Sequence, residues 1–108
     1  MEAQRIIITG GATRIGAAIA EKLSGPNKQI IIHYNKSKAK AENLKKKLQN
    51  YGSKIYLVKG NLSKEKDVMK IVKFAKSKLK YFDCLVNNAS LFENDKLNNF
   101  SSKSWENH

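Results

Sequence analysis

The octapeptide "TGGATRIG" (residues 9–16) directly follows the apolar run "III" of residues 6–8. Its glycines Gly10 and Gly16 lie six positions apart, a spacing that is weak evidence alone because glycine is common. Dinucleotide-binding turns, however, join a buried strand to a helix and carry glycines at such a spacing. The context therefore predicts a phosphate-binding turn, with Arg14 at the position where a third glycine is usual.

Each glycine has a physical reason to stand there. Gly10 can adopt the positive φ of a tight turn, and Gly16 removes a side chain where the helix would meet a ligand or the sheet. The N–H groups of the first helical turn would then face a pyrophosphate, assisted by the helix dipole. The alternative is a glycine-rich turn with a structural role alone.

Four short apolar runs alternate with helical patterns along the chain. The runs cover residues 5–9, 29–33, 54–58 and 84–87, and continuous apolar runs suit strands that are buried on both faces. Apolar residues recur at helical spacing between them: Ile15, Ala18, Ile19 and Leu23; Ala41, Leu44, Leu48 and Tyr51; Val68, Ile71, Val72, Ala75 and Leu79. Ser63 is a candidate N-cap of the third helix.

This alternation predicts an α/β fold. Strands that alternate with helices of this length form a parallel sheet. We expect the N-terminal part of a doubly wound Rossmann fold, with four parallel strands and flanking helices, in which residues 1–108 belong to one domain. After Asn88 the pattern loosens into a loop, and a helix is expected to begin near residues 102–105.

Composition excludes several classes of protein. The net charge is +12, but 19 of the 21 basic residues are lysine, whereas readers of base edges favour arginine. We therefore interpret the charge as solvated surface and expect neither nucleic-acid nor membrane binding. No run of 18 apolar residues predicts a membrane span. The single cysteine, Cys84, fits a reducing, cytoplasmic location, and we expect no metal site.

The end of the second strand indicates the cofactor. Enzymes that prefer NAD carry Asp or Glu there to bind the ribose 2′-hydroxyl, but "HYNKSK" (residues 33–38) contains no acid. Arg14, Lys36 and Ser37 could instead meet the 2′-phosphate of NADP(H), since a guanidinium offers several N–H donors to a phosphate. The alternative for Arg14 is a solvated side chain.

Two further features lie near the expected adenosine. Tyr34 and Lys38 match the pattern Tyr-x-x-x-Lys, but their place at the tip of the second strand is remote from the nicotinamide, so we assign them no catalytic role. Asn61 and Leu62 follow the third strand and would border the adenine, although a loop-capping role for Asn61 is equally compatible with the sequence.

With "CLVNNASLF" (residues 84–92), the chain resembles the N-terminal part of a short-chain dehydrogenase/reductase. That family has a Thr-Gly-rich turn after strand one and Asn-Asn-Ala-Gly after strand four. Within it, the chain is most similar to the pteridine reductases. Those proteins have an arginine in the first turn, His-Tyr followed by basic and serine residues after strand two, and Asn-Asn-Ala-Ser near a phenylalanine.

The resemblance implies a set of site residues. Those expected at NADP(H) are Thr9, Gly10, Arg14, Ile15, Gly16, His33, Tyr34, Asn35, Lys36, Ser37, Asn61, Leu62, Asn88, Ala89 and Ser90. Those expected at the substrate are Arg14, Ser90 and Phe92, the last as an aromatic plate against a planar ring or, alternatively, as a loop anchor. Asn61 departs from the family, which usually has aspartate there, and this weakens the expected adenine contact.

The resemblance also implies residues that this chain does not contain. The family's catalytic Tyr-x-x-x-Lys is expected beyond His108, and family members are about twice as long. We therefore expect a fragment that is inactive and prone to aggregate, because its fourth strand would be a bare apolar edge. The longer parent would be a homo-dimer or homo-tetramer.

These inferences converge on an oxidoreductase that transfers hydride from NADPH to a planar C=N or C=O substrate, with a pteridine as the candidate that the resemblance implies. A general short-chain reductase of ketones or aldehydes is the nearest alternative. A non-catalytic NADP(H)-binding module is an alternative of another class.

Overall fold

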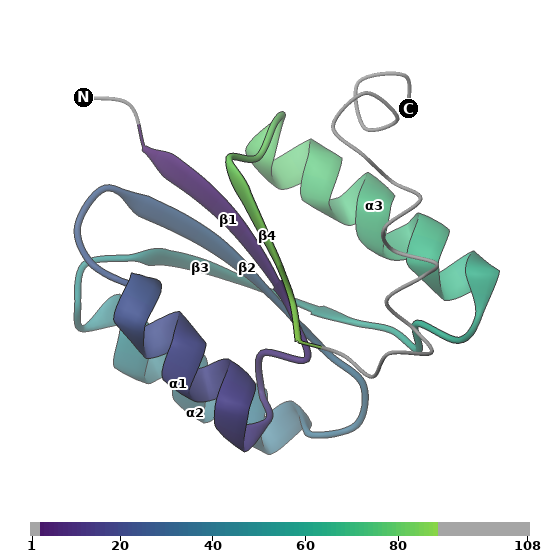
Figure 1. Ribbon diagram of the computed structural model, residues 1–108, viewed down its shortest axis with the longest axis horizontal. Coiled ribbons are helices and arrows are strands. Elements are labelled where there is room, and N and C mark those ends of the chain that lie inside the picture. The colour runs from purple at the N-terminus through teal and green to yellow at the C-terminus, as the bar shows by residue number, and fades with distance from the viewer. Residues whose placement is uncertain (1–2, 89–108) are drawn as a thin grey trace.

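The computed structural model describes residues 3–88, which form seven alternating elements around one sheet (Figure 1). In chain order they are β1 (Gln4–Thr9), α1 (Arg14–Leu23), β2 (Lys28–Tyr34), α2 (Lys38–Gln49), β3 (Lys54–Lys59), α3 (Glu65–Leu79) and β4 (Cys84–Asn87). The predicted strands are therefore all present, and the first three extend one or two residues beyond the predicted bounds. The helix expected near residues 102–105 lies outside the described residues.

The four strands form one parallel sheet in the order β3-β2-β1-β4. Ile6 of β1 pairs with Ile30 of β2 on one side and with Cys84 of β4 on the other. Because β1 and β2 lie inside the sheet, their side chains are covered on both faces, which explains their unbroken isoleucine runs. The predicted Rossmann-like α/β fold with flanking helices is confirmed.

Helices cover both faces of the sheet, α3 on one and α1 with α2 on the other (Figure 1). Ile7 and Ile31 pack with the apolar face of α3, whereas Ile6, Ile8 and Ile30 pack with α1 and α2. Successive strand residues point to opposite faces, so each isoleucine triplet supplies both cores.

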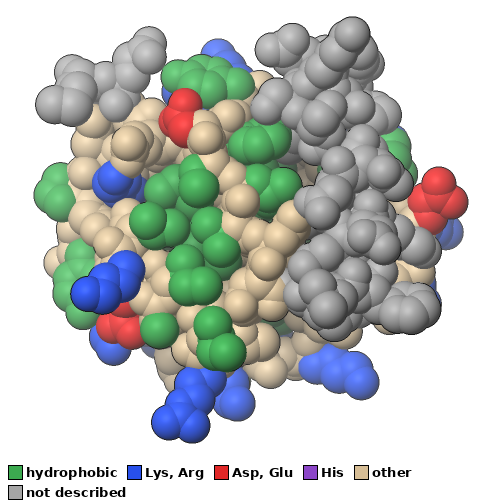
Figure 2. All heavy atoms as spheres, in the orientation of Figure 1, with side chains coloured by type: hydrophobic (Ala, Val, Ile, Leu, Met, Phe, Trp, Pro, Cys, Tyr) green, Lys and Arg blue, Asp and Glu red, His purple; other side chains and the backbone are tan. Residues whose placement is uncertain are grey.

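Helix α1 packs differently from the prediction. The expected apolar stripe faces the sheet only in part: Leu23 packs against the core, but Ile15 is 67% exposed, and the fully buried residues of the helix are Gly16 and Ala20. Small residues let the helix approach the strands closely, and Ile15 lies on an open outer surface with Ile19 and Leu23 partly exposed. Figure 2 shows hydrophobic side chains gathered there, in the region of α1 and β4. Residues Arg14, Ile15, Ala18, Ile19, Lys22 and Leu23 line this surface.

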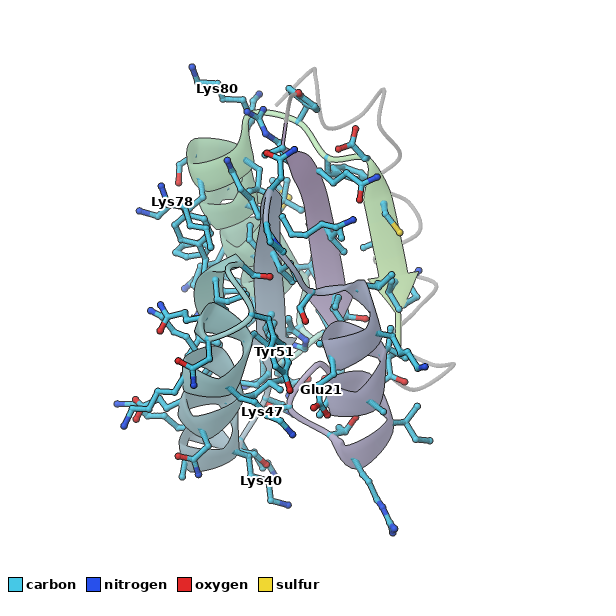
Figure 3. The ribbon with its side chains drawn as sticks, turned by 90° about the vertical axis from the view of Figure 1, so that its left-hand side faces the viewer. Glu21, Lys40, Lys47, Tyr51, Lys78 and Lys80 are labelled. Carbon is cyan, nitrogen blue, oxygen red and sulfur yellow. The ribbon has the colours of Figure 1, made fainter. Side chains whose placement is uncertain are left out.

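Helix α2 buries Ala41, Leu44 and Leu48 as predicted, but Tyr51 lies beyond its last turn and is 45% exposed. An ion pair of 2.6 Å between Lys47 Nζ and the Glu21 carboxylate joins α2 to α1, and Figure 3 shows these two side chains between the helices. Through hydrogen bonding and charge, Glu21 raises the pKa of Lys47. Lys47 is exposed and Glu21 is half-buried, so the contribution of the pair to stability is small.

The predicted N-cap of α3 is wrong. Lys64, and not Ser63, occupies the cap position, and it makes no side-chain cap hydrogen bond. The polar residues before the helix form a turn of their own, in which the Asn61 side-chain oxygen accepts hydrogen bonds from the Ser63 backbone N–H and hydroxyl. Among residues 3–88, no helix is long and apolar enough to cross a membrane, and no cluster of metal-ligating side chains occurs.

Candidate functional site

The carboxyl ends of β1, β2 and β4 meet at one edge of the sheet, where their loops touch. The Gly11 N–H donates to the His33 carbonyl oxygen at 3.0 Å, which links the turn after β1 to the end of β2. The Asn88 backbone N–H donates to the Thr9 hydroxyl at 3.1 Å, which links the same turn to the end of β4. In open α/β sheets, ligands bind at this edge.

The turn after β1 has the predicted glycine geometry. Gly10 has φ +63°, which a side chain would strain. A Cβ on Gly16 would lie 2.2 Å from the Gly10 carbonyl oxygen and 2.7 Å from the Asn88 side-chain nitrogen. Gly16 therefore allows the first turn of α1 to rest directly on the Gly10 turn, and no other residue type fits without moving the backbone.

Thr13, which the sequence analysis did not select, fixes the start of α1. Its hydroxyl donates to the Gly10 carbonyl oxygen at 2.7 Å and accepts from the Gly16 N–H at 3.1 Å. The first backbone bond within the helix runs from the Ala17 N–H to Thr13. A threonine before an apolar periodic run is an N-cap signal that could have identified this residue.

Asn88 completes the turn from the other side. Its side-chain nitrogen donates to the Gly10 carbonyl oxygen at 3.0 Å and to the Thr13 hydroxyl at 2.9 Å. Since Asn88 follows β4 directly, this amide ties the fourth strand to the first turn. Asn88 is thus placed at the predicted cofactor site, where its side chain supports the backbone of the turn.

Electrostatics at this edge favour an anion. Helices α1 and α2 both begin here, and neither has an acidic residue in its first turn. Arg14 is the first residue of α1 and is exposed, as are Asn35, Lys36 and Ser37 between β2 and α2. The side chain of Ser37 makes no cap hydrogen bond although it precedes α2. This edge of the sheet therefore carries two positive helix ends, two exposed cations and the exposed Ser37 hydroxyl.

Helix α3 provides the contrast. Its first turn contains Glu65 and Asp67, and the Asp67 carboxylate accepts from the Asn61 N–H at 2.8 Å. That hydrogen bond is the largest cause that lowers the pKa of Asp67 below its ordinary value. The positive N-terminal end of α3 is thus compensated by acidic residues of its own first turn. The Asn61 side chain caps the loop before α3, which is one of the two roles that the sequence allowed.

Several predicted site residues are buried. The side chains of Thr9, His33, Tyr34 and Leu62 are at most 9% exposed. Tyr34 packs with Ala12 and Ala41, and Leu62 packs in the core under α3. These side chains lie beneath the surface at the sheet edge. Their contact with a cofactor therefore stays a prediction. Ala89, Ser90 and Phe92 lie outside the described residues.

Comparisons with known proteins agree with this geometry. The short chain dehydrogenase family model matches residues 4–108. The short-chain dehydrogenase/reductase FrzI of a Cladobotryum species is 31% identical over 100 residues, which are 93% of this chain and 39% of that protein. The chain therefore spans well under half the length of this curated relative.

Solved structures show the same architecture. A short-chain dehydrogenase from Oenococcus oeni PSU-1 has a TM-score of 0.72 and 25% identity, covering 97% of this chain and 54% of that one. A dehydrogenase structure from Burkholderia cenocepacia with bound NADP has a TM-score of 0.74 and 26% identity, covering 89% of this chain and 42% of that one. From its sheet order, its glycine turn and these matches, the chain belongs to the short-chain dehydrogenase family.

Proposed function

We propose that this chain is the cofactor-binding part of an NADP(H)-dependent oxidoreductase. One observation carries the proposal: the acid-free beginnings of α1 and α2 lie at one sheet edge with Arg14 and Lys36 exposed beside them. A carboxylate at the end of β2, which would favour the NAD ribose and repel a phosphate, is absent from the described residues 33–38. The bound NADP in the Burkholderia structure supports the cofactor class.

The residues present fit such a cofactor. The close contact between Gly16 and the Gly10 turn leaves the backbone N–H groups of Arg14 and Ile15 at the open helix end, suited to a pyrophosphate. Arg14, Lys36 and Ser37 would hold the 2′-phosphate, with the guanidinium as the main contact. When bound, NADPH supplies the hydride, and the protein supplies placement and electrostatics.

The substrate class follows from the residues after β4. We propose a planar C=N or C=O compound, with a pteridine as the first candidate, because Asn88 precedes Ala89, Ser90 and Phe92 in the order that resembles pteridine reductases. Arg14 and Ser90 would contact its polar edge and Phe92 its face. Reduction of a general ketone or aldehyde is the alternative. The proton-donating residues would lie in sequence beyond His108, and the complete enzyme would be a homo-dimer or homo-tetramer.

The test compares dissociation constants for NADPH and NADH by quenching of protein fluorescence. The wild-type chain should bind NADPH at least about tenfold more tightly, and Arg14→Ala should remove most of that preference, since one charge-assisted contact contributes about 1.5–3 kcal/mol. Lys22→Ala is the matched control, because it removes a cation from the last turn of the same helix. Equal affinity of the wild type for both cofactors would refute the 2′-phosphate assignment.

A further inference from the structure

One imidazole joins two loops at the carboxyl edge of the sheet. His33, the penultimate residue of β2, is 3% exposed. The Gly10 N–H donates to its Nδ1 at 3.0 Å, and its Nε2 lies 2.7 Å from the Gly60 carbonyl oxygen. The ring therefore connects the turn after β1 to the loop between β3 and α3, which are the two loops on either side of β2.

These contacts define the protonation state of the ring. A ring nitrogen can accept the Gly10 N–H only through a lone pair, so Nδ1 carries no proton. The carbonyl oxygen of Gly60 accepts and does not donate, so Nε2 carries the proton and donates it. The observed geometry thus requires neutral His33 in its Nε2–H form. A proton added to Nδ1 would place two N–H groups against each other and remove the acceptor from Gly10.

Charged groups on the surrounding elements act in both directions. One acid is tied to the loop that holds Gly60: the Asp67 carboxylate accepts from the N–H of Asn61, the residue after Gly60. Its negative charge favours an imidazolium, whereas burial of the ring opposes one. The charged side chains next to these loops include Arg14, Lys36, Lys38, Lys59, Lys64, Glu65, Lys66 and Lys70, which are exposed and mostly cationic. They add repulsion against a positive ring.

We propose that His33 is a pH-sensitive positioning residue that holds the phosphate-binding turn in place only while its ring is neutral. Uptake of one proton from water at Nδ1 breaks the Gly10 hydrogen bond and loosens the turn, which then keeps only its contacts to Thr13, Asn88 and the His33 backbone. Histidine titrates at about pH 6.5 in water. Protonation of His33 at lower pH therefore weakens binding of a phosphate-bearing cofactor. This consequence rests on the function proposed above.

The structural half of the proposal is tested without any cofactor. Nitrogen-15 NMR of the imidazole ring in the full chain should find Nδ1 unprotonated and Nε2 protonated at about pH 7.5. As the ring titrates, amide exchange of Gly10 should accelerate at least about tenfold, because exchange follows local opening. The amide of Ile32, one residue earlier in β2, should not follow this titration. A proton on Nδ1 at neutral pH, or a Gly10 amide indifferent to the titration, would overturn the proposal.

The functional half compares NADPH affinity between about pH 8 and about pH 5.5. Only the fraction of molecules with neutral His33 binds in the positioned state, so affinity should fall by up to tenfold for each pH unit below the ring's titration. His33→Asn keeps an acceptor oxygen near the position of Nδ1 and cannot take up a proton. It should bind less tightly at neutral pH, because the Gly60 bond is lost, and should show a flatter pH profile.

Two controls separate the possible outcomes. The cofactor's phosphate itself titrates near pH 6, but it does so equally in every variant, so the difference between profiles belongs to His33. His108→Asn removes the other histidine of the chain and should keep the wild-type profile. Identical profiles for wild type and His33→Asn would refute the proposal. If NADPH bound at no pH, the proposed function would fail, while the ring-nitrogen and amide measurements would still decide the role of His33.

Discussion

The side-chain amide of Asn88 donates to the carbonyl oxygen of Gly10 at 3.0 Å, across 78 positions of the chain. The same nitrogen donates to the Thr13 hydroxyl, which itself donates to Gly10. Three residues from the ends of β1 and β4 and from the cap of α1 thereby form one closed hydrogen-bonded group. The phosphate-binding turn is therefore held by a residue far away in sequence as well as by its own glycines.

The hydrogen-bonded group predicts coupling between Thr13 and Asn88. Thr13→Ala should lower the free energy of unfolding by about 1 kcal/mol, the usual effect of losing a threonine N-cap. Asn88→Ala removes the other partner, and the double variant should be less destabilised than the sum of the two by at least about 0.5 kcal/mol. Urea unfolding of all four proteins measures this, and strictly additive effects would show that the two side chains act independently.

Gly16→Ala should be far more harmful than its size suggests. The new methyl group would lie 2.2 Å from the Gly10 carbonyl oxygen, so the helix end must move away from the turn. We expect a loss of about 1–3 kcal/mol in the free energy of unfolding, as for other overpacked sites, and at least about tenfold weaker NADPH binding. Ala18→Ser, on the exposed side of the same helix, is the control and should bind normally.

Asp67 should make stability depend on acid pH. The Asn61 N–H holds the pKa of the Asp67 carboxyl below its ordinary value of 3.8. A carboxyl group with a lowered folded-state pKa contributes stability that is complete above its unfolded pKa and is lost as pH falls through the folded one. Asp67→Asn keeps an acceptor for Asn61 without the charge, so the wild type's advantage over this variant should vanish in strong acid.

Urea midpoints between about pH 6 and about pH 2.5 provide this measurement. Glu65→Gln is the matched control, since it removes the other acidic side chain from the first turn of α3. An Asp67→Asn difference that stays constant over the whole range would mean that the carboxylate charge contributes nothing to the fold.

The outer surface of α1 should tolerate polar residues. Ile15 is 67% exposed, so Ile15→Ser should change the free energy of unfolding by less than about 0.5 kcal/mol while raising the solubility limit. Ile8→Ala, at a fully buried position of β1, should instead cost about 2–5 kcal/mol. A comparable loss in both variants would show that Ile15 is covered in solution, for example by a second copy of the chain.

The fold could be predicted from sequence because its main determinants are local and periodic. The isoleucine runs of β1 and β2 favour the interior of a parallel sheet, and the intervening patterns have helical spacing. The packing of α1 could not be predicted in the same way. Its apolar residues occupy two sides, and the choice between them depends on how closely Gly16 and Ala20 let the helix approach the strands.

The site was predictable in its glycines and much less so in its supporting contacts. Gly10 and Gly16 stand in a recognisable order after β1, and both have the close geometry expected of them. The bonds from Asn88 to Gly10 and from Gly10 to His33 join residues that are 78 and 23 positions apart. Such pairings exist only after the sheet has formed, so no short motif in the sequence encodes them.

The central claim is that the first turn and Arg14 hold the phosphates of NADP(H). The most direct test is a crystal structure of the chain with NADPH bound. The account predicts the pyrophosphate at the N–H groups of Arg14 and Ile15, and the 2′-phosphate within about 3 Å of the Arg14 guanidinium. A cofactor bound elsewhere, or a 2′-phosphate directed into solvent away from Arg14, would contradict it.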